Sequence, residues 1–110
     1  MDSRFTASEA LAAARAAADG VYGVVFNRGT IEIGYYAPVG KDVQEPHAQD
    51  EIYVVHSGCG LFELDGDVRP CSAGDVLFVP ANVSHRFRDV SDKFGAWVIF
   101  VGAAGREPDR

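Results

Sequence analysis

The chain has 110 residues, a formal net charge of −6 and 47% hydrophobic residues, which is enough for one hydrophobic core and too little for two. The negative charge opposes binding to nucleic acid phosphates or anionic lipid head groups, so neither is an expected partner. No segment approaches the roughly 18 consecutive apolar residues of a membrane helix, and the first residues lack the apolar centre of a signal peptide. We therefore expect a single-domain cytoplasmic protein.

A short helix is expected near the start of the chain. Thr6 and Glu9 fit a capping box, and the alanine-rich run over 7–18 favours helix. Gly20 suits the left-handed conformation that often ends a helix. Since Leu11 is the only large apolar side chain in this run, the helix should pack on the outside of the domain or against a second subunit.

From residue 21 onward, short β-branched and aromatic runs alternate with turn residues, a pattern typical of many short strands. The predicted strands occupy 22–27, 30–37, 44–56, 59–64, 68–72, 76–79, 84–89 and 94–101. No helical pattern interrupts them, so the strands must close into a barrel or stack as a sandwich. The predicted layout is a helical segment at 1–20, a barrel at 21–102 and a flexible tail at 103–110.

One predicted strand starts polar and ends apolar. Four polar side chains alternate with their neighbours along it: Glu45, His47, Gln49 and Glu51. A continuous strand would turn all four to one face, and Tyr53 would extend that face with an apolar side chain. Such a stripe suits the inside of a barrel with a wet mouth and a dry floor.

A second segment places a histidine directly after a tight turn. An apolar run ends at Pro80, and the next strand begins near His85, with Phe87 on the same face. A side chain held in this way is rigid, as a metal ligand must be. The third histidine, His56, falls on the opposite face from His47, so we expect it at the surface or at a subunit interface.

The first of these segments resembles the first conserved motif of the cupin superfamily. His47 is followed after three residues by Glu51 and after six more by Gly58, which matches the spacing of that motif. Glu45 departs from the pattern, because it stands where the family has its first histidine. It can be a fourth metal ligand or point into solvent at the mouth, and Gln49 is the alternative fourth ligand.

The second segment resembles the second cupin motif. Gly74, Pro80 and His85 match it at the correct spacings, and fifteen residues separate the two motifs, as in small single-domain cupins. Asn82 replaces a glycine, a mild change because asparagine tolerates the left-handed conformation. Asp89 replaces the terminal asparagine of the motif.

The resemblance implies an all-β fold, a single jelly-roll cupin barrel (a double-stranded β-helix) with a short N-terminal helix. It also implies one divalent metal ion held by His47, Glu51 and His85. Two imidazoles and a carboxylate suit Fe(II), and further carboxylate oxygens favour Mn or Fe, with Zn or Ni as other candidates. Cupins include dioxygenases, isomerases and lyases, so the fold alone selects no reaction.

The expected function is that of a metal-dependent enzyme acting on a small oxygenated metabolite, with Glu45 as a ligand or as the catalytic base. The alternative is a non-catalytic module that binds a small ligand in the same pocket. Five aromatic residues are candidates for the pocket wall, although strand aromatics more often belong to the core: Tyr35, Tyr53, Phe62, Phe87 and Trp97. An exposed strand edge and the small size of the barrel predict a homodimer.

Overall fold

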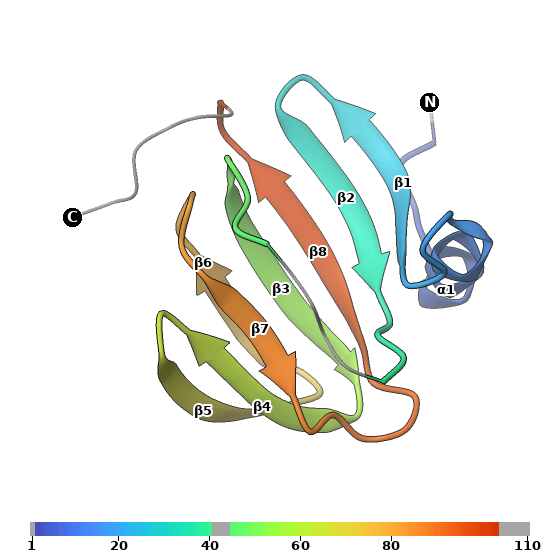
Figure 1. Ribbon diagram of the computed structural model, residues 1–110. Helices are drawn as coiled ribbons and strands as arrows, with labels where there is room; N and C mark the ends of the chain where they lie inside the picture. The colour runs from blue at the N-terminus through green and yellow to red at the C-terminus, as the bar shows by residue number, and fades with distance from the viewer. Residues whose placement is uncertain (1, 41–44, 104–110) are drawn as a thin grey trace.

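The computed structural model describes residues 2–40 and 45–103, and within these ranges the chain forms one helix and eight strands (Figure 1). The elements are α1 (Ala7–Ala16), β1 (Tyr22–Arg28), β2 (Ile31–Tyr36), β3 (Asp50–Ser57), β4 (Cys59–Leu64), β5 (Asp67–Ser72), β6 (Val76–Val79), β7 (His85–Arg88) and β8 (Gly95–Val101). Most of the strand boundaries lie within one residue of the sequence prediction. The tail predicted for 103–110 falls, apart from its first residue, outside the described residues.

The strands form two antiparallel sheets that enclose one core. The larger sheet has the order β1-β2-β8-β3-β6, and the smaller has the order β5-β4-β7. Figure 1 shows the smaller sheet lying against one half of the larger sheet, while α1 lies beside β1. This arrangement confirms the predicted all-β jelly-roll barrel with a short N-terminal helix.

Aromatic side chains from both sheets fill the space between them. The ring of Tyr53 lies 4.9 Å from that of Phe87, centroid to centroid, and Phe62 lies 5.2 Å from Phe87. All three side chains are at least nine-tenths buried. Tilted aromatic contacts of this kind add to the stability that burial alone provides, so the barrel has a rigid, dry floor.

Helix α1 covers the outer face of the larger sheet at its β1 and β2 end. Thr6 accepts a hydrogen bond from the Glu9 backbone N–H at 3.2 Å, which confirms the predicted N-cap. A Cβ atom at Gly23 would lie 2.3 Å from the α1 backbone, so only glycine lets the helix approach this closely. The helix ends at Ala16, two residues earlier than predicted. It is too short to cross a membrane, and the described residues contain no other helix.

The strand predicted over 44–56 was wrong in its first half. Strand β3 begins at Asp50, and residues 45–49 are irregular, whereas 41–44 lie outside the described residues. Pro46 has no backbone N–H to donate to a strand ladder, which disfavours a strand at that residue. The alternation argument for the polar residues before Asp50 therefore does not hold.

Candidate metal centre

Three side chains from separate segments converge inside the barrel: His47 from the irregular segment, Glu51 from β3 and His85 from β7. Their potential ligand atoms all lie within 4.8 Å of one another. Glu51 Oε1 is 3.1 Å from His85 Nε2 and 3.9 Å from His47 Nε2, and the two imidazole centroids are 5.2 Å apart. The two sequence segments that resemble the cupin motifs thus meet at one point.

The hydrogen bonding of His85 indicates that a cation lies between His85 Nε2 and the Glu51 carboxylate. His85 Nδ1 lies 2.9 Å from the Val83 carbonyl oxygen, to which it donates, so a neutral ring has its lone pair on Nε2. That lone pair faces a carboxylate oxygen of Glu51 at 3.1 Å. Two electron pairs at this distance repel each other unless a cation, either a proton or a metal ion, lies between them.

A metal ion satisfies all three groups, whereas one proton can join only two of them. Metal bonds of about 2.1 Å that meet at tetrahedral or octahedral angles place their ligand atoms about 3.0–3.4 Å apart. The distance of 3.1 Å from Glu51 to His85 already lies in that range, and the distance of 3.9 Å from Glu51 to His47 exceeds it by about 0.5 Å. Glu51 Oε1 is buried and accepts no hydrogen bond among the described residues, a rare condition in a folded protein unless the atom has another role.

Burial keeps the histidine at the mouth ready for a metal. The pKa of His47 lies below its usual value because desolvation disfavours the charged ring, although the Glu51 carboxylate partly opposes this effect. At neutral pH the ring is therefore neutral, as metal binding requires. Glu51 and His85 are almost completely buried, at 1% and 3% exposure, while the His47 side chain is 37% exposed. The centre thus opens to solvent on the His47 side.

Backbone hydrogen bonds tie the two histidine segments together. The Asn82 N–H donates to the His47 carbonyl at 2.7 Å, and the Ala81 N–H donates to Asp50 Oδ1 at 2.9 Å. Asn82 adopts a left-handed backbone (φ 66°), as expected for the residue in the glycine position of the motif. The turn that precedes His85 is thereby held against the start of β3. Asp50 escaped the sequence analysis, since its partner lies 31 residues away.

A cavity of about 520 Å³ adjoins the centre. Its wall includes His47, Glu51 and the predicted pocket residue Tyr53, together with Glu45 and Tyr22. Glu45 is exposed and stands at the rim, and it does not belong to the group of converging ligand atoms. Glu45 therefore lies beside the candidate centre, and the converging group consists of His47, Glu51 and His85 without it.

Gln49 is bonded away from the centre. Its Nε2 donates to the carbonyl oxygens of Thr30 and Gly102, at 2.8 Å and 2.7 Å. These bonds anchor the segment that carries His47 to the β1–β2 turn and to the end of β8. The contacts explain Gln49 as a positioning residue and offer no support for the ligand role predicted for it.

Two of the aromatic residues predicted for the pocket wall lie on the opposite face of the sheet. Tyr35 and Trp97 pack with Ala10 of α1 on the outer face, where the Tyr35 hydroxyl lies 3.1 Å from Nδ1 of the exposed His56. Successive residues of a strand point to opposite faces, so Tyr36 rather than Tyr35 lines the cavity. The pocket prediction is corrected for these two residues.

The other two predicted aromatic residues, Phe62 and Phe87, belong to the core beneath Tyr53. They support the floor of the site and are absent from the lining of the 520 Å³ cavity. Two polar residues that the sequence analysis overlooked do lie close to the centre. Tyr22 lines the cavity and donates a hydrogen bond to Glu32 Oε2 at 2.7 Å.

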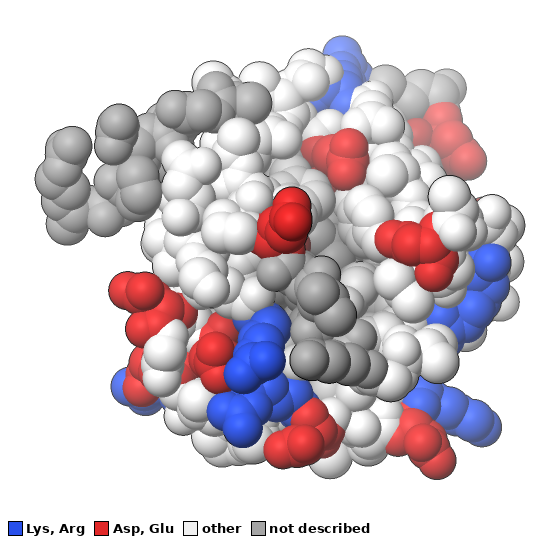
Figure 2. Space-filling model, viewed as in Figure 1, with Lys and Arg blue, Asp and Glu red and all other residues white. Residues whose placement is uncertain are grey.

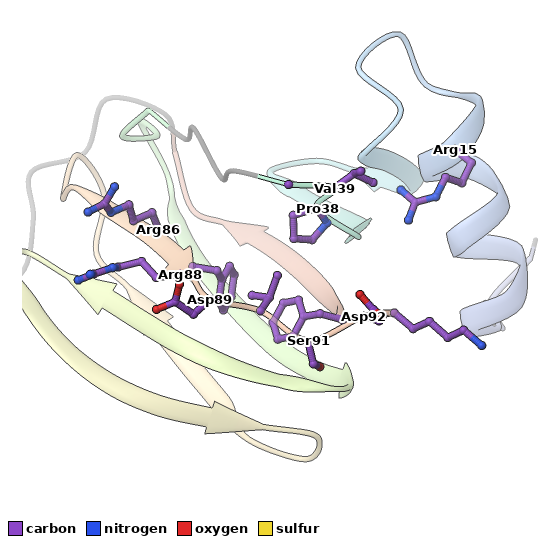
Figure 3. Close-up of a pocket in the computed structure, with 13 residues that line it drawn as sticks. Arg15, Pro38, Val39, Arg86, Arg88, Asp89, Ser91 and Asp92 are labelled. Carbon is purple, nitrogen blue, oxygen red and sulfur yellow. The ribbon is translucent and has the colours of Figure 1, made fainter.

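A second cavity, of about 600 Å³, lies between α1 and β7 and contains none of the three converging ligands (Figure 3). Arg86 and Arg88 extend from β7 in the same direction and form ion pairs with Glu63 at 3.3 Å and 3.2 Å. Arg15 donates to the carbonyl oxygens of Gly20 and Ala37. Figure 2 shows basic and acidic side chains grouped over β7 and β4. These three cations are engaged by protein groups, and the group of converging ligand atoms lies outside this cavity.

Comparison with known proteins establishes the class of protein that this fold and centre define. The cupin domain family matches residues 33–102 of the chain, a range that contains both histidine segments. The chain belongs to the cupin family. The sequence resemblance and the fold prediction are both confirmed by this match.

The chain is similar in sequence to proteins of Streptomyces. It is 38% identical over 92 residues to the uncharacterized protein SCO3923 of Streptomyces coelicolor, a match that covers 82% of this chain and 88% of that protein. It is 30% identical over 63 residues to the polyketide synthase CurC of Streptomyces cyaneus, covering 57% of this chain and 40% of CurC. A crystal structure of unknown function from Rhizobium leguminosarum superposes with a TM-score of 0.71 and 24% identity, covering 91% of this chain and 97% of that one.

Proposed function

We propose that this cupin is an enzyme that uses one divalent transition metal ion, Fe or Mn in preference, on a small oxygenated metabolite. The observation that carries the proposal is the convergence of His47, Glu51 and His85, whose ligand atoms lie within 4.8 Å of one another around a buried carboxylate oxygen that accepts no hydrogen bond among the described residues. Two imidazoles and one carboxylate leave coordination positions open, as a metal that meets a substrate requires.

In this proposal the three ligands hold the metal ion, and the adjoining cavity admits the substrate. A divalent ion in such a site polarises a bound oxygen and stabilises the negative charge that develops on it. His85 and Glu51 form the buried side of the site, and His47 borders the cavity through which a substrate enters. Glu45, at the rim of that cavity, is our candidate for the base that takes a proton from the substrate.

The relatives support a biosynthetic substrate. CurC is named a polyketide synthase, and polyketide skeletons carry the ketone and hydroxyl oxygens that a metal of this kind binds. The shared segment spans less than half of CurC, so the support concerns the kind of substrate and not a particular compound. An oxygenase, an isomerase or a lyase acting on such a skeleton is consistent with the site.

Metal analysis of the purified protein tests the proposal. We expect one equivalent of divalent metal in protein prepared without chelator, and loss of that metal in His85→Ala. The matched control is His56→Ala, because His56 is exposed on the outer face and should leave the metal content unchanged. Metal-free wild-type protein that stays metal-free after incubation with Fe(II), Mn(II) and Zn(II) would overturn the proposal.

Turnover separates the enzyme from the alternative, a non-catalytic module that binds a small ligand. We expect metal-loaded protein to convert hydroxylated ketones, with oxygen uptake if the reaction is an oxygenation and none if it is an isomerisation or a lyase reaction. Glu45→Gln should retain the metal and lose turnover. Ligand binding without turnover by the loaded protein would favour the binding module.

A further inference from the structure

Tyr22 and Glu32 form a hydrogen-bonded pair beside the cavity of the metal centre. Tyr22 Oη donates to Glu32 Oε2 at 2.7 Å, and the bond is partly buried. Tyr22 lines the same cavity as His47 and Glu51. The proposed metal ligands make no use of this pair, so its position calls for a separate explanation.

Strand register places the pair close to the three ligands. Glu32 on β2 lies opposite Phe100 on β8, and Phe100 lies opposite Glu51 on β3. Directly opposed residues share one face of a sheet, so Glu32 and Glu51 flank Phe100 on the inner face. The ring of Phe100 lies 6.3 Å from that of Tyr22 and 5.0 Å from that of His47. One aromatic ring thus separates the pair from the metal centre.

A glycine in β2 makes room for the phenol of Tyr22. A Cβ atom at Gly34 would lie 2.5 Å from Tyr22 Oη, a distance that real Cβ atoms do not tolerate. Gly34 precedes neither a turn nor a helix; it lies within β2, where a glycine weakens the strand. Its presence is explained by the phenol that lies over it and reaches Glu32.

Tyr22 lines the cavity, and Glu32, which is not among the described lining residues, accepts the hydrogen bond of its hydroxyl. Burial, together with the hydrogen bond to Glu32, raises the pKa of Tyr22 far above its usual value, so the phenol keeps its proton. The phenol O–H donates its hydrogen bond to Glu32 Oε2. What remains are lone pairs on the phenol oxygen and on the carboxylate, and both accept hydrogen bonds. A ligand group that binds here must therefore donate one.

The charge of the cavity wall limits the classes of ligand that can bind there. The charged residues that line the cavity within the described ranges are Asp19, Glu45 and Glu51, apart from the titratable His47, and none of the described lining residues is a lysine or an arginine. Glu32 adds another carboxylate next to this wall. Even with one divalent ion at the centre, the surroundings disfavour carboxylates and phosphates as ligands.

We propose that Tyr22 and Glu32 bind a hydroxyl group of an uncharged ligand whose carbonyl oxygen lies at the metal centre. The ligand class is a neutral hydroxy ketone, and the pair selects it against ketones without a hydroxyl group and against carboxylates. This inference rests on the proposed function, because the second anchor of the ligand is the ion held by His47, Glu51 and His85.

The test uses protein loaded with zinc, a diamagnetic ion that accepts nitrogen and oxygen ligands, and follows binding by ¹⁵N chemical-shift titration. The probes are cyclohexanone, cyclohexanecarboxylate and three hydroxycyclohexanones that differ in the distance between hydroxyl and ketone. We expect at least one hydroxycyclohexanone to bind about tenfold more tightly than cyclohexanone, the gain typical of a hydrogen bond to a charged group. Equal affinity for cyclohexanone and all three hydroxycyclohexanones would overturn the inference.

Two variants assign the preference to the pair. Tyr22→Phe should bind zinc normally and lose most of the tenfold hydroxyl preference. Glu32→Gln replaces an acceptor with a group that can donate, so its discrimination against cyclohexanecarboxylate should shrink. A purely structural strut between β1 and β2 would change thermal stability without changing either ratio of affinities, and that result would overturn the inference.

The matched control is Tyr35→Phe, which removes a phenol hydroxyl on the outer face, bonded to His56. It should leave every affinity unchanged. The two proposals fail in different ways. If wild-type protein binds no zinc, the proposed function fails. If wild-type and Tyr22→Phe bind zinc equally and share the same hydroxyl preference, the metal centre stands and only the role of the pair is lost.

Discussion

The two faces of the five-stranded sheet are built from the same strands but differ in function: the inner face carries the candidate site and the core, and the outer face is a partly exposed apolar surface. On β3 the inward residues Glu51, Tyr53 and Val55 are 1% exposed or less, and they form part of the candidate metal centre and of the apolar core beneath it. The outward residues Ile52 and Val54 are only half-buried. Alternation thus lets one strand carry a polar site on one side and an apolar surface on the other.

The outer face differs along its length as well. At the β1 and β2 end it is covered by α1, which buries Tyr35. Strand register also aligns apolar side chains of β8, β3 and β6 on this face in two rows: Ile99, Ile52 and Phe78, and then Trp97, Val54 and Val76, of which Trp97 packs against the residues beneath α1. On the edge strand β6, Phe78 is 45% exposed and Val76 is 67% exposed. The three converging side chains of the candidate metal centre therefore lie on the inner face, whereas these two rows of the outer face carry only apolar side chains.

The largest difference between the faces should appear in stability. Phe87→Ala removes a ring that is 2% exposed and contacts Tyr53 at 4.9 Å, and it should lower the free energy of unfolding by about 3–5 kcal/mol. Phe78→Ala is the matched change on the outer face and should cost about 1 kcal/mol or less. Urea unfolding of both variants checks the contrast, and equal losses would contradict the assignment of core and surface.

In metal-free protein, the buried Glu51 carboxylate of the candidate metal centre should lower the free energy of unfolding. Glu51→Leu replaces a buried carboxylate, one oxygen of which accepts no hydrogen bond among the described residues, with an apolar side chain of similar size. We expect the metal-free variant to gain about 1–3 kcal/mol in free energy of unfolding and to lose metal binding. Chemical denaturation in EDTA measures the first effect and equilibrium dialysis the second; a less stable variant would show that Glu51 is fully satisfied by protein groups.

Replacing Asp50, which supports the turn before His85, should weaken metal binding by a smaller amount. Asp50 Oδ1 accepts a hydrogen bond from Ala81, in the turn before His85, so Asp50→Ala should displace that histidine. Loss of such a supporting residue typically weakens metal binding by about 10-fold to 100-fold. Competition with a chromophoric chelator provides the measurement. An unchanged affinity would mean that the hydrogen bond from Asn82 to the His47 carbonyl holds the turn without help.

The homodimer predicted from the sequence remains to be tested, and we propose that it forms through the uncovered part of the outer face. The two apolar rows bear no charge, so two copies of a chain with net charge −6 can meet there without placing like charges in contact. Phe78→Glu should then give a monomer, while Val68→Glu, on the smaller sheet at 40% exposure, should not. Sedimentation velocity at tens of micromolar distinguishes the two outcomes; a monomeric wild type would contradict the proposal.

The strand rhythm predicted the fold, and the resemblance of two short segments to the cupin motifs predicted the three converging residues. The strand rhythm and the spacing from Glu51 to Gly58 can be read without any tertiary information. The reason given for His47 was nevertheless wrong, since it does not lie on a strand. Its place is set by hydrogen bonds to distant partners, such as that from Asn82 to its carbonyl oxygen, and no local pattern reveals them.

The remaining site residues depend on strand pairing. Tyr35 and Tyr36 are adjacent, and the register of β2 against β8 decides which of the two faces inward. Tyr22 meets Glu32 because the register of β1 against β2 sets Tyr22 opposite Tyr36, from where its phenol reaches across Gly34. A shift of one residue moves every side chain of a strand to the other face, so these positions could not be predicted from the sequence alone.

A crystal of the protein saturated with Mn(II) tests the central claim most directly, because anomalous scattering locates the metal independently of the protein atoms. The account predicts one strong anomalous peak inside the barrel, about 2.0–2.3 Å from His47 Nε2, from His85 Nε2 and from a Glu51 carboxylate oxygen. Mn(II) bound only at surface carboxylates, with His85 Nε2 hydrogen-bonded to Glu51 and no peak between them, would contradict it.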